Sequence, residues 1–202
     1  MKKIFALLTL VLATCITAMA ATPAEVLDRA ARKLKNAMSI YADYTLTADG
    51  HSNTGTILMS ADRFTITSPE MLSWYDGKTQ WTYAKQIGEV NVVTPTPDEL
   101  QQVNPFAIIR SFSRDYKASA LPSPAGTTKL RLTNDTGRGD IDTVDITFSD
   151  STGYPTQMSI LLNGGQRVNI KVHGIRDGGP QSTSKFKFNP KDFPGVQVVD
   201  LR

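Results

Sequence analysis

The sequence predicts a mainly β protein of the α+β class, in which helices cover one face of a curved antiparallel sheet. Apolar and polar residues alternate over many short segments separated by turn residues, which is the pattern of half-buried strands. One earlier stretch, residues 23–38, has helical spacing instead. Two short amphipathic stretches interrupt the alternation only once, at residues 97–103 and 105–112. The close spacing of the strands favours an antiparallel meander over βαβ units.

A long helix is predicted first, at residues 23–38. Thr22 and Glu25 form a capping box around Pro23, which is a favoured first helical residue. The apolar positions that follow recur every three or four residues, while the charged residues lie off this stripe. The helix is therefore expected to pack one face on the sheet.

The alternating segments predict eleven strands and one further short alternating piece. Six strands are expected before the short helices, at 40–46, 55–59, 63–67, 71–75, 79–84 and 89–93. Five follow them, at 116–120, 129–133, 141–149, 156–162 and 166–174, and residues 185–188 alternate again before a C-terminal stretch at 195–202. Asp49-Gly50, Asp76-Gly77 and Asn163-Gly164 are the turn signals between neighbouring strands.

The two short helices are predicted to form a lid over the sheet. Thr96 and Glu99 repeat the capping box around Pro97, and Asn104-Pro105 begins the second helix. Helices this short are marginal in water on their own, so packing on the sheet must hold them. Such elements open at a modest free-energy cost.

The first twenty residues have the parts of a secretory signal peptide. Lys2 and Lys3 precede an apolar run, and Ala18-Met19-Ala20 resembles a cleavage site. Cleavage there would leave one domain, residues 21–202, outside the inner membrane in the periplasm. Cys15 offers lipidation as an alternative, although Thr14 fits a lipidation motif poorly. After simple cleavage the protein would have no Cys and no disulfide.

Composition argues against nucleic acid, metal and catalysis. Removing Lys2 and Lys3 leaves 20 Lys and Arg against 19 Asp and Glu, a net charge of +1, and the chain has no basic run. His51 and His173 have no Cys partner or carboxylate pattern for a metal site. The chain contains no Gly-x-Ser-x-Gly elbow and no glycine-rich phosphate loop before a helix. Neither an enzyme nor a cofactor is therefore expected.

Large apolar residues on one side of several strands indicate an ordinary filled core, which the residues alone favour, or an apolar cavity. A curved sheet carries more apolar surface on its hollow side than one long and two short helices fill. A filled core leaves no such cavity. For Trp81 and Tyr83, cross-strand packing in a hairpin is as well supported as a place in the cavity wall. The expected cavity residues are Ile57, Met59, Phe64, Ile66, Trp81, Tyr83, Ile146, Phe148, Met158 and Ile160.

Four pieces of the chain resemble the outer-membrane lipoprotein carrier family, LolA and its relatives. They are the capped helix after the signal peptide, the hairpin DGKTQWTY at 76–83, Asn104-Pro105-Phe106, and a tail. The tail reads FKFNP at 186–190 and GVQVVDLR at 195–202. The resemblance implies an unclosed antiparallel β half-barrel covered by helices, with a cavity that accepts lipoprotein acyl chains.

The resemblance also implies partners and a lid. Cargo would come from an inner-membrane ABC-type release complex and pass to an outer-membrane acceptor, without a cofactor; we expect a monomer. The lid residues would be Leu100, Val103, Phe106, Ile109 and Phe112. The family has a basic residue on an early strand that holds the lid shut, and Arg63 is the candidate here. A carrier or sensor of another lipid, such as a glycolipid or pigment precursor, and a non-binding structural domain remain as alternatives.

Overall fold

The computed structural model describes residues 21–202. The predicted signal peptide, its cleavage site and Cys15 lie outside these residues. Within residues 21–202, no helix is long and apolar enough to cross a membrane.

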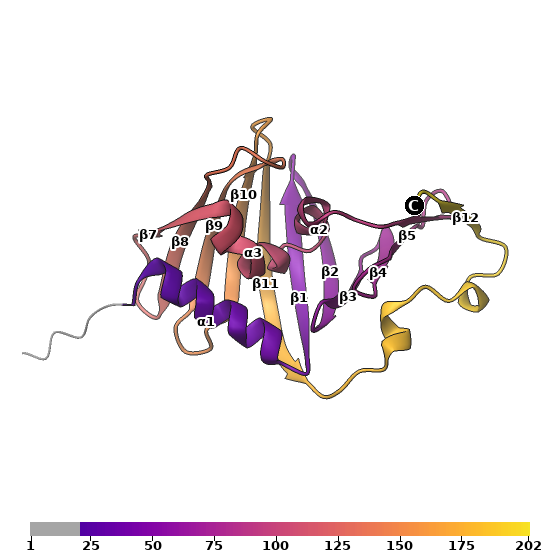
Figure 1. Cartoon of the computed structure of the whole chain (residues 1–202), viewed down its shortest axis with the longest axis horizontal. Helices are drawn as coiled ribbons and strands as arrows, with labels where there is room; N and C mark the ends of the chain where they lie inside the picture. Colours follow the sequence, from indigo (N-terminus) through magenta and orange to yellow (C-terminus); the bar gives the residue numbers. More distant parts are fainter. Residues whose placement is uncertain (1–20) are drawn as a thin grey trace, which may run out of the picture.

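The protein is built on one twelve-stranded sheet made of two antiparallel meanders (Figure 1). The first meander contains β1 (Ser39–Ala48), β2 (His51–Ser60), β3 (Arg63–Thr67), β4 (Met71–Tyr75), β5 (Gln80–Ala84) and β6 (Glu89–Val93). The second contains β7 (Tyr116–Leu121), β8 (Thr127–Asn134), β9 (Ile141–Ser149), β10 (Pro155–Leu162) and β11 (Arg167–Gly178). The predicted strands are therefore confirmed, with boundaries that differ by a few residues.

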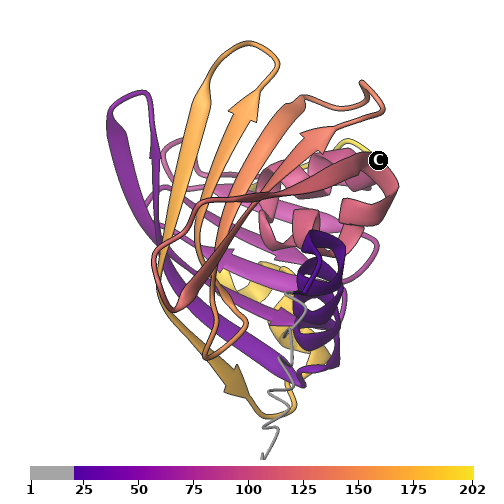
Figure 2. The same ribbon diagram turned by 90° about the vertical axis from the view of Figure 1, so that its left-hand side faces the viewer.

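The two meanders are joined because β1, the first strand, pairs with β11, the last long one. Their register runs from Ser39 opposite Gly178 to Ala48 opposite Val168, with a bulge between Asp43 and Tyr44. β7 and β12 (Gln197–Asp200) are the two outer strands, so the sheet does not close. The predicted unclosed antiparallel sheet is confirmed, and Figure 2 shows it curving around the helices.

Three α-helices pack on one side of this sheet, which we call the inner face (Figures 1 and 2). They are α1 (Pro23–Asn36), α2 (Pro97–Val103) and α3 (Phe106–Asp115). Thr22 caps α1 through the predicted reciprocal hydrogen bonds with Glu25. α1 buries Leu27, Ala30 and Leu34 in a core shared with α3 and both halves of the sheet.

The C-terminal segment differs from the predicted alternating piece at residues 185–188. Residues 183–186 form a 3₁₀ turn, η1 (Thr183–Phe186), and a second turn, η2 (Pro190–Asp192), follows. The chain then adds β12 to the edge of the sheet, parallel to β6. We call residues 183–196 the strap. Phe186 is fully buried but belongs to no strand. A 3₁₀ turn also places side chains at regular intervals, so the alternation at residues 185–188 did not identify a strand.

The strap lies on the outer face of the sheet, opposite the helices. The hydroxyl of Thr65 donates a 2.6 Å hydrogen bond to the carbonyl of Lys185. Its neighbours Phe64 and Ile66 point the other way, into the core, because side chains alternate along a strand. The sheet therefore has two covered regions, one under the helices and one under the strap.

Candidate functional site

A cavity of about 190 Å³ lies between the inner face and the lid helices. Its walls are mainly apolar and come from strands of both meanders and from the junction between α2 and α3. It is lined by Tyr44, Leu46, Ile57, Ile66, Ile141, Ile160, Leu162, Val168, Ile170, Val103, Pro105 and Phe106, with Gln101, Gln102 and Asp140 as its polar members.

The expected cavity residues divide into three groups. Ile57, Ile66 and Ile160 line the cavity. Five others are buried in the surrounding core on the same face; they are Met59, Phe64, Ile146, Phe148 and Met158. These eight therefore point to the predicted side of the sheet, although most of them support the cavity rather than face it.

Trp81 and Tyr83, the remaining two, lie on the outer face, so their expected placement is corrected. Trp81 is directly opposite Trp74 across the β4–β5 pair, and opposite residues share a face. The ring of Tyr83 is 5.0 Å from that of Phe193 in the strap, and the ring of Trp74 is 5.6 Å from it. Alternation shows that residues two apart share a face, but it does not say which face.

Sequence reasoning missed the residues at the β1–β11 junction, which lies at the middle of the cavity wall. Tyr44 and Leu46 of β1 line the cavity, together with Val168 and Ile170 of β11. Leu46 lies directly opposite Ile170. Tyr44 belongs to a predicted alternating segment, and burial raises the pKa of its hydroxyl. Only the pairing of the first and last long strands brings these residues together, and no local pattern reports that pairing.

The lid residues divide between the cavity and the core. Val103 and Phe106 line the cavity at the point where α2 gives way to α3. Ile109 and Phe112 are buried in the core, and Leu100 packs against it. Ile108 is also fully buried, and α3 contacts α1 as well as the sheet. α3 is therefore the more firmly held of the two helices.

A capping box starts α2, and a hydrogen bond to the side chain of Asn104 directs the chain into α3. The Thr96 hydroxyl accepts a 3.3 Å hydrogen bond from the amide of Glu99, whose carboxylate accepts one of 2.7 Å from the Thr96 amide. These bonds lower the pKa of Glu99. The side-chain oxygen of Asn104 accepts a 3.1 Å hydrogen bond from the amide of Phe106 and turns the chain into α3.

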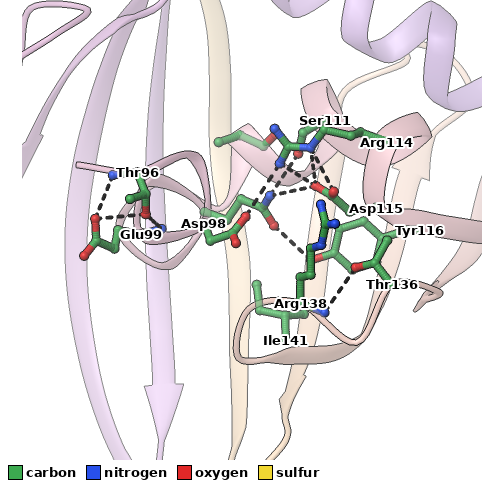
Figure 3. Close-up of polar contacts among 12 residues, drawn as sticks. Thr96, Asp98, Glu99, Ser111, Arg114, Asp115, Tyr116, Thr136, Arg138 and Ile141 are labelled. Carbon is green, nitrogen blue, oxygen red and sulfur yellow. Dashed lines mark hydrogen bonds and ion pairs between the residues drawn. The ribbon is translucent and has the colours of Figure 1, made fainter. Parts of the chain in front are cut away.

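A buried amide of α2 contacts the end of α3, and Figure 3 labels its partners Ser111, Asp115 and Tyr116. Gln101 is 4% exposed, and its oxygen accepts a 2.9 Å hydrogen bond from the Tyr116 hydroxyl. Its amide nitrogen donates to the hydroxyl of Ser111 at 3.2 Å and to Asp115 at 3.4 Å. Burial, with Asp115 and Asp98 nearby, raises the pKa of Tyr116 to about 12.

Arg114 adds charge to this contact. Its Nε lies 2.8 Å from one oxygen of Asp115, and hydrogen bonds from Arg114 hold the pKa of that carboxyl below its usual range. The same guanidinium lies 3.6 Å from Asp98 in the first turn of α2. At the mouth of the cavity, Gln102 donates a 2.8 Å hydrogen bond to Asp140. α2 is therefore held mainly by polar contacts and α3 mainly by apolar ones.

Few ionisable groups line this cavity in the part of the chain that the structure describes. Within residues 21–202, Asp140 and the Tyr44 hydroxyl are the ionisable groups among the cavity-lining side chains. In the same part of the chain, no three His, Cys, Asp or Glu side chains are placed to hold a metal ion. An apolar space bounded by short helices is suited to holding an apolar group.

Comparison with known proteins agrees with this geometry. The family described as outer membrane lipoprotein carrier protein LolA matches residues 13–175. The chain belongs to the LolA family. Among the curated proteins, none matches the sequence.

Several solved structures are similar to this chain at low sequence identity. An uncharacterized conserved protein from Thermus thermophilus has a TM-score of 0.59 at 15% identity, over 88% of this chain and 98% of that one. A LolA superfamily protein from Nitrosomonas europaea has a TM-score of 0.45 at 13% identity, over 84% and 99%. A putative outer membrane lipoprotein-sorting protein domain from Vibrio parahaemolyticus has a TM-score of 0.46 at 8% identity, over 83% of this chain and 96% of that one.

The LolA resemblance suggests Arg63 as the basic residue that holds the lid, and the structure places this side chain elsewhere. Arg63 points to the outer face, where its guanidinium lies 4.8 Å from the centre of the Phe186 ring. It also donates a long hydrogen bond of 3.4 Å to Ser60. Arg63 starts β3 one residue before the inward-facing Phe64, so alternation turns it away from the lid.

A different arginine connects the lid to the sheet. Arg110 of α3 donates a 2.8 Å hydrogen bond to the carbonyl of Ala61 and forms an ion pair with Asp62. Both partners belong to the β2–β3 turn, where Ala61 has a positive φ of 51°. Arg110 therefore joins α3 to the β2–β3 turn, which supplies both acceptors.

Proposed function

We propose that this protein is a periplasmic carrier that holds the acyl chains of lipoproteins in its cavity and moves them from the inner to the outer membrane. The observation that carries the proposal is the apolar cavity closed by α2 and α3. Membership of the LolA family supports the same class of function. The inner-membrane ABC-type release complex and the outer-membrane acceptor are part of this proposal, as is action as a monomer.

The size of the cavity requires the lid to move during loading. Its volume of about 190 Å³ is below the range of about 300–1,000 Å³ that holds drug-sized ligands. An acyl chain therefore enters only if Val103 and Phe106 leave the space that they border. A seven-residue helix such as α2 is unstable alone, so a local opening is less costly than global unfolding.

Lid movement also keeps the affinity within a range that permits release. Each buried methylene group contributes about 0.8 kcal/mol, so several long acyl chains could gain tens of kcal/mol. Non-covalent affinities reach only about −18 to −21 kcal/mol, and a carrier must bind less tightly to pass on its cargo. The contacts that the lid loses on opening offset part of the gain.

The deciding experiment is native mass spectrometry of the mature protein incubated with membranes that carry an acylated lipoprotein. We expect a complex with the lipoprotein that is lost when its acyl chains are removed. A protein that carries only free lipid would favour a carrier of another lipid. A protein that stays empty would favour a structural domain that has the fold but does not bind lipid.

Lid variants link such a complex to this site. Phe106→Glu and Val103→Glu introduce a charge beside the cavity and should abolish loading; Val103 is half-buried, so its variant keeps more of the core. Ile87→Glu is the matched control, because Ile87 is 69% exposed in the β5–β6 turn. Unchanged loading by Val103→Glu, in a folded protein, would contradict the proposed lid.

A carrier of a smaller free lipid is the second candidate. The closed cavity favours it, since a single-chain amphiphile requires less displacement of α2 and α3 than a lipoprotein with several chains. This candidate predicts loading by free amphiphiles and no release of lipoprotein from inner membranes.

A further inference from the structure

The outer face of β1 and β7–β11 carries an excess of positive charge. Strand register places six Lys and Arg side chains on this side, namely Lys117, Lys129, Arg131, Arg167, Lys171 and Arg176. Asp43 and Asp145 are the acidic residues of these strands on this side, and Asp135 pairs with Lys117 at 2.8 Å at its edge, which leaves a net charge of +3. We call this surface the basic outer face.

This charge is separated from the rest of the molecule. Residues 21–202 contain 20 Lys and Arg and 19 Asp and Glu, a net charge of +1. The remainder of the domain therefore has a net charge of −2. A solvated sheet face is ordinarily polar, but it need not have one sign of charge. Segregation of this kind steers oppositely charged partners to one surface.

The basic outer face also has a shape that a partner can enter. A hollow of about 300 Å³ lies over β1, β11, β10 and β9, with Lys129, Lys171 and His173 on its walls. Asp145 is neutralised by Arg131, at 2.6 Å, and by Lys129, at 3.9 Å. Within residues 21–202, Arg167 and Lys171 form no ion pair with an acid, so their charges are available.

Hydrogen-bonding groups fill the space between these charges. Ser159 and Asn169 bond to each other at 2.8 Å, and Thr45 bonds to His173 at 2.7 Å. Membrane-surface binding, by contrast, combines basic residues with apolar side chains that insert into the bilayer. The large apolar residues that are most exposed lie off this face, at Met38, Ile87, Val198 and Leu201. This composition favours a protein partner over a lipid surface.

We infer that the basic outer face is a docking surface for an acidic segment of a partner protein. The surface lies across the sheet from the cavity, so a partner bound there leaves α2 and α3 free to open. Electrostatic complementarity at such a surface mainly accelerates association, and the effect weakens as salt screens the charges. The inference is independent of what the cavity holds.

The test is an NMR titration of the mature protein with a synthetic peptide of alternating Glu and Ser residues. At low salt we expect shifts confined to β1 and β8–β11, with weaker binding at about 0.15 M NaCl. Arg167→Glu combined with Lys171→Glu should weaken binding about tenfold or more. Lys78→Glu with Lys191→Glu is the matched control, since it changes the net charge equally in the β4–β5 turn and the strap.

Three outcomes would overturn the inference. They are no binding, equal weakening by the two double variants, and stronger binding to phosphatidylglycerol vesicles than to the peptide. The last would identify a lipid surface instead. Lipoprotein loading in the absence of a partner should be unchanged in Arg167→Glu/Lys171→Glu, so failure of this inference is distinguishable from failure of the carrier proposal.

Discussion

Arg110 of the lid donates a 2.8 Å hydrogen bond to the backbone carbonyl of Ala61. The bond joins α3 to the β2–β3 turn, and the neighbouring Asp62 adds an ion pair. Arg110 is only 28% exposed at its side chain, whereas Asp62 is 74% exposed. The backbone carbonyl cannot be removed by mutating Ala61.

Replacing Arg110 should make the lid easier to open. A hydrogen bond contributes about 0.5–1.5 kcal/mol and an exposed ion pair about 0–1 kcal/mol. Arg110→Ala should therefore speed uptake of an apolar fluorescent dye by about three- to tenfold. Stopped-flow fluorescence measures this rate. Arg63→Ala is the control, because Arg63 lies on the outer face; faster uptake in that variant alone would contradict the assignment.

Acid should loosen the contact between α2 and α3. Hydrogen bonds from Arg114 and, across the helices, from Gln101 lower the pKa of Asp115 in the folded protein, so this carboxylate stabilises the contact with α2 above its unfolded pKa of about 4. That stabilisation is lost as pH falls through the lower folded value. Amide exchange in α2 should therefore accelerate, relative to the intrinsic rate, below about pH 4.

A substitution separates Asp115 from the other carboxyl groups. Asp115→Asn should already have fast exchange in α2 at neutral pH, with a smaller further change on acidification. Asp28→Asn, on the exposed side of α1, should behave like the unmodified protein. If Asp115→Asn shows the same acid response as the parent, the contact between Asp115 and Gln101 does not hold α2.

The wall of the cavity depends on a glycine in β2. A Cβ atom added to Gly55 would lie 2.6 Å from the hydroxyl of Tyr44 and 2.9 Å from the carbonyl of Thr67. The second contact is with backbone, so moving Tyr44 alone does not relieve it. Gly55→Ala should lower the free energy of unfolding by about 1–3 kcal/mol and shift Tyr44 in the cavity wall. Urea unfolding measures the first effect.

Gly164 provides the control for this substitution. It lies in the β10–β11 loop, and an added Cβ would meet no atom within 4 Å. Gly164→Ala should be neutral or stabilise the protein by up to about 1 kcal/mol, because alanine lowers the conformational entropy of the unfolded chain. Equal stability of the two alanine variants would show that β2 has room for a side chain at Gly55.

The sequence predicted local features of this fold better than long-range ones. The capping boxes at Thr22 and Thr96 and the alternation of each strand are local, and the structure has them where expected. Pairing of β1 with β11 joins residues more than a hundred positions apart, so no local pattern reports it. That pairing places Tyr44 and Val168 at the cavity.

The same limit explains the two misplaced parts of the site. Trp81 and Arg63 occupy alternating strands, and alternation defines two faces without saying which one the helices cover. Only the position of the strap, which returns from the C-terminus to cover Trp74 and Arg63, settles the matter. The contact of Arg110 could not be predicted from the sequence either, because its acceptor is the backbone carbonyl of Ala61, which no side-chain pattern marks.

The strap should stabilise the outer face without affecting the cavity. The ring of Phe193 lies 5.6 Å from Trp74, 5.0 Å from Tyr83 and 5.3 Å from Phe188. Because Phe193 is half-buried, Phe193→Ala should lower the free energy of unfolding by about 1–3 kcal/mol, less than a fully buried aromatic residue would. Tryptophan emission should move to longer wavelength as Trp74 becomes exposed.

Dye uptake separates this structural role from a role in cargo binding. Uptake should be unchanged in Phe193→Ala, since the strap and the lid lie on opposite faces of the sheet. Val198→Ala is the control for stability, because Val198 is 46% exposed on β12 and should change it by less than about 0.5 kcal/mol. Loss of uptake in folded Phe193→Ala would mean that the aromatic residues under the strap communicate with the cavity. That result would restore Trp81 and Tyr83 as candidates for the cargo site.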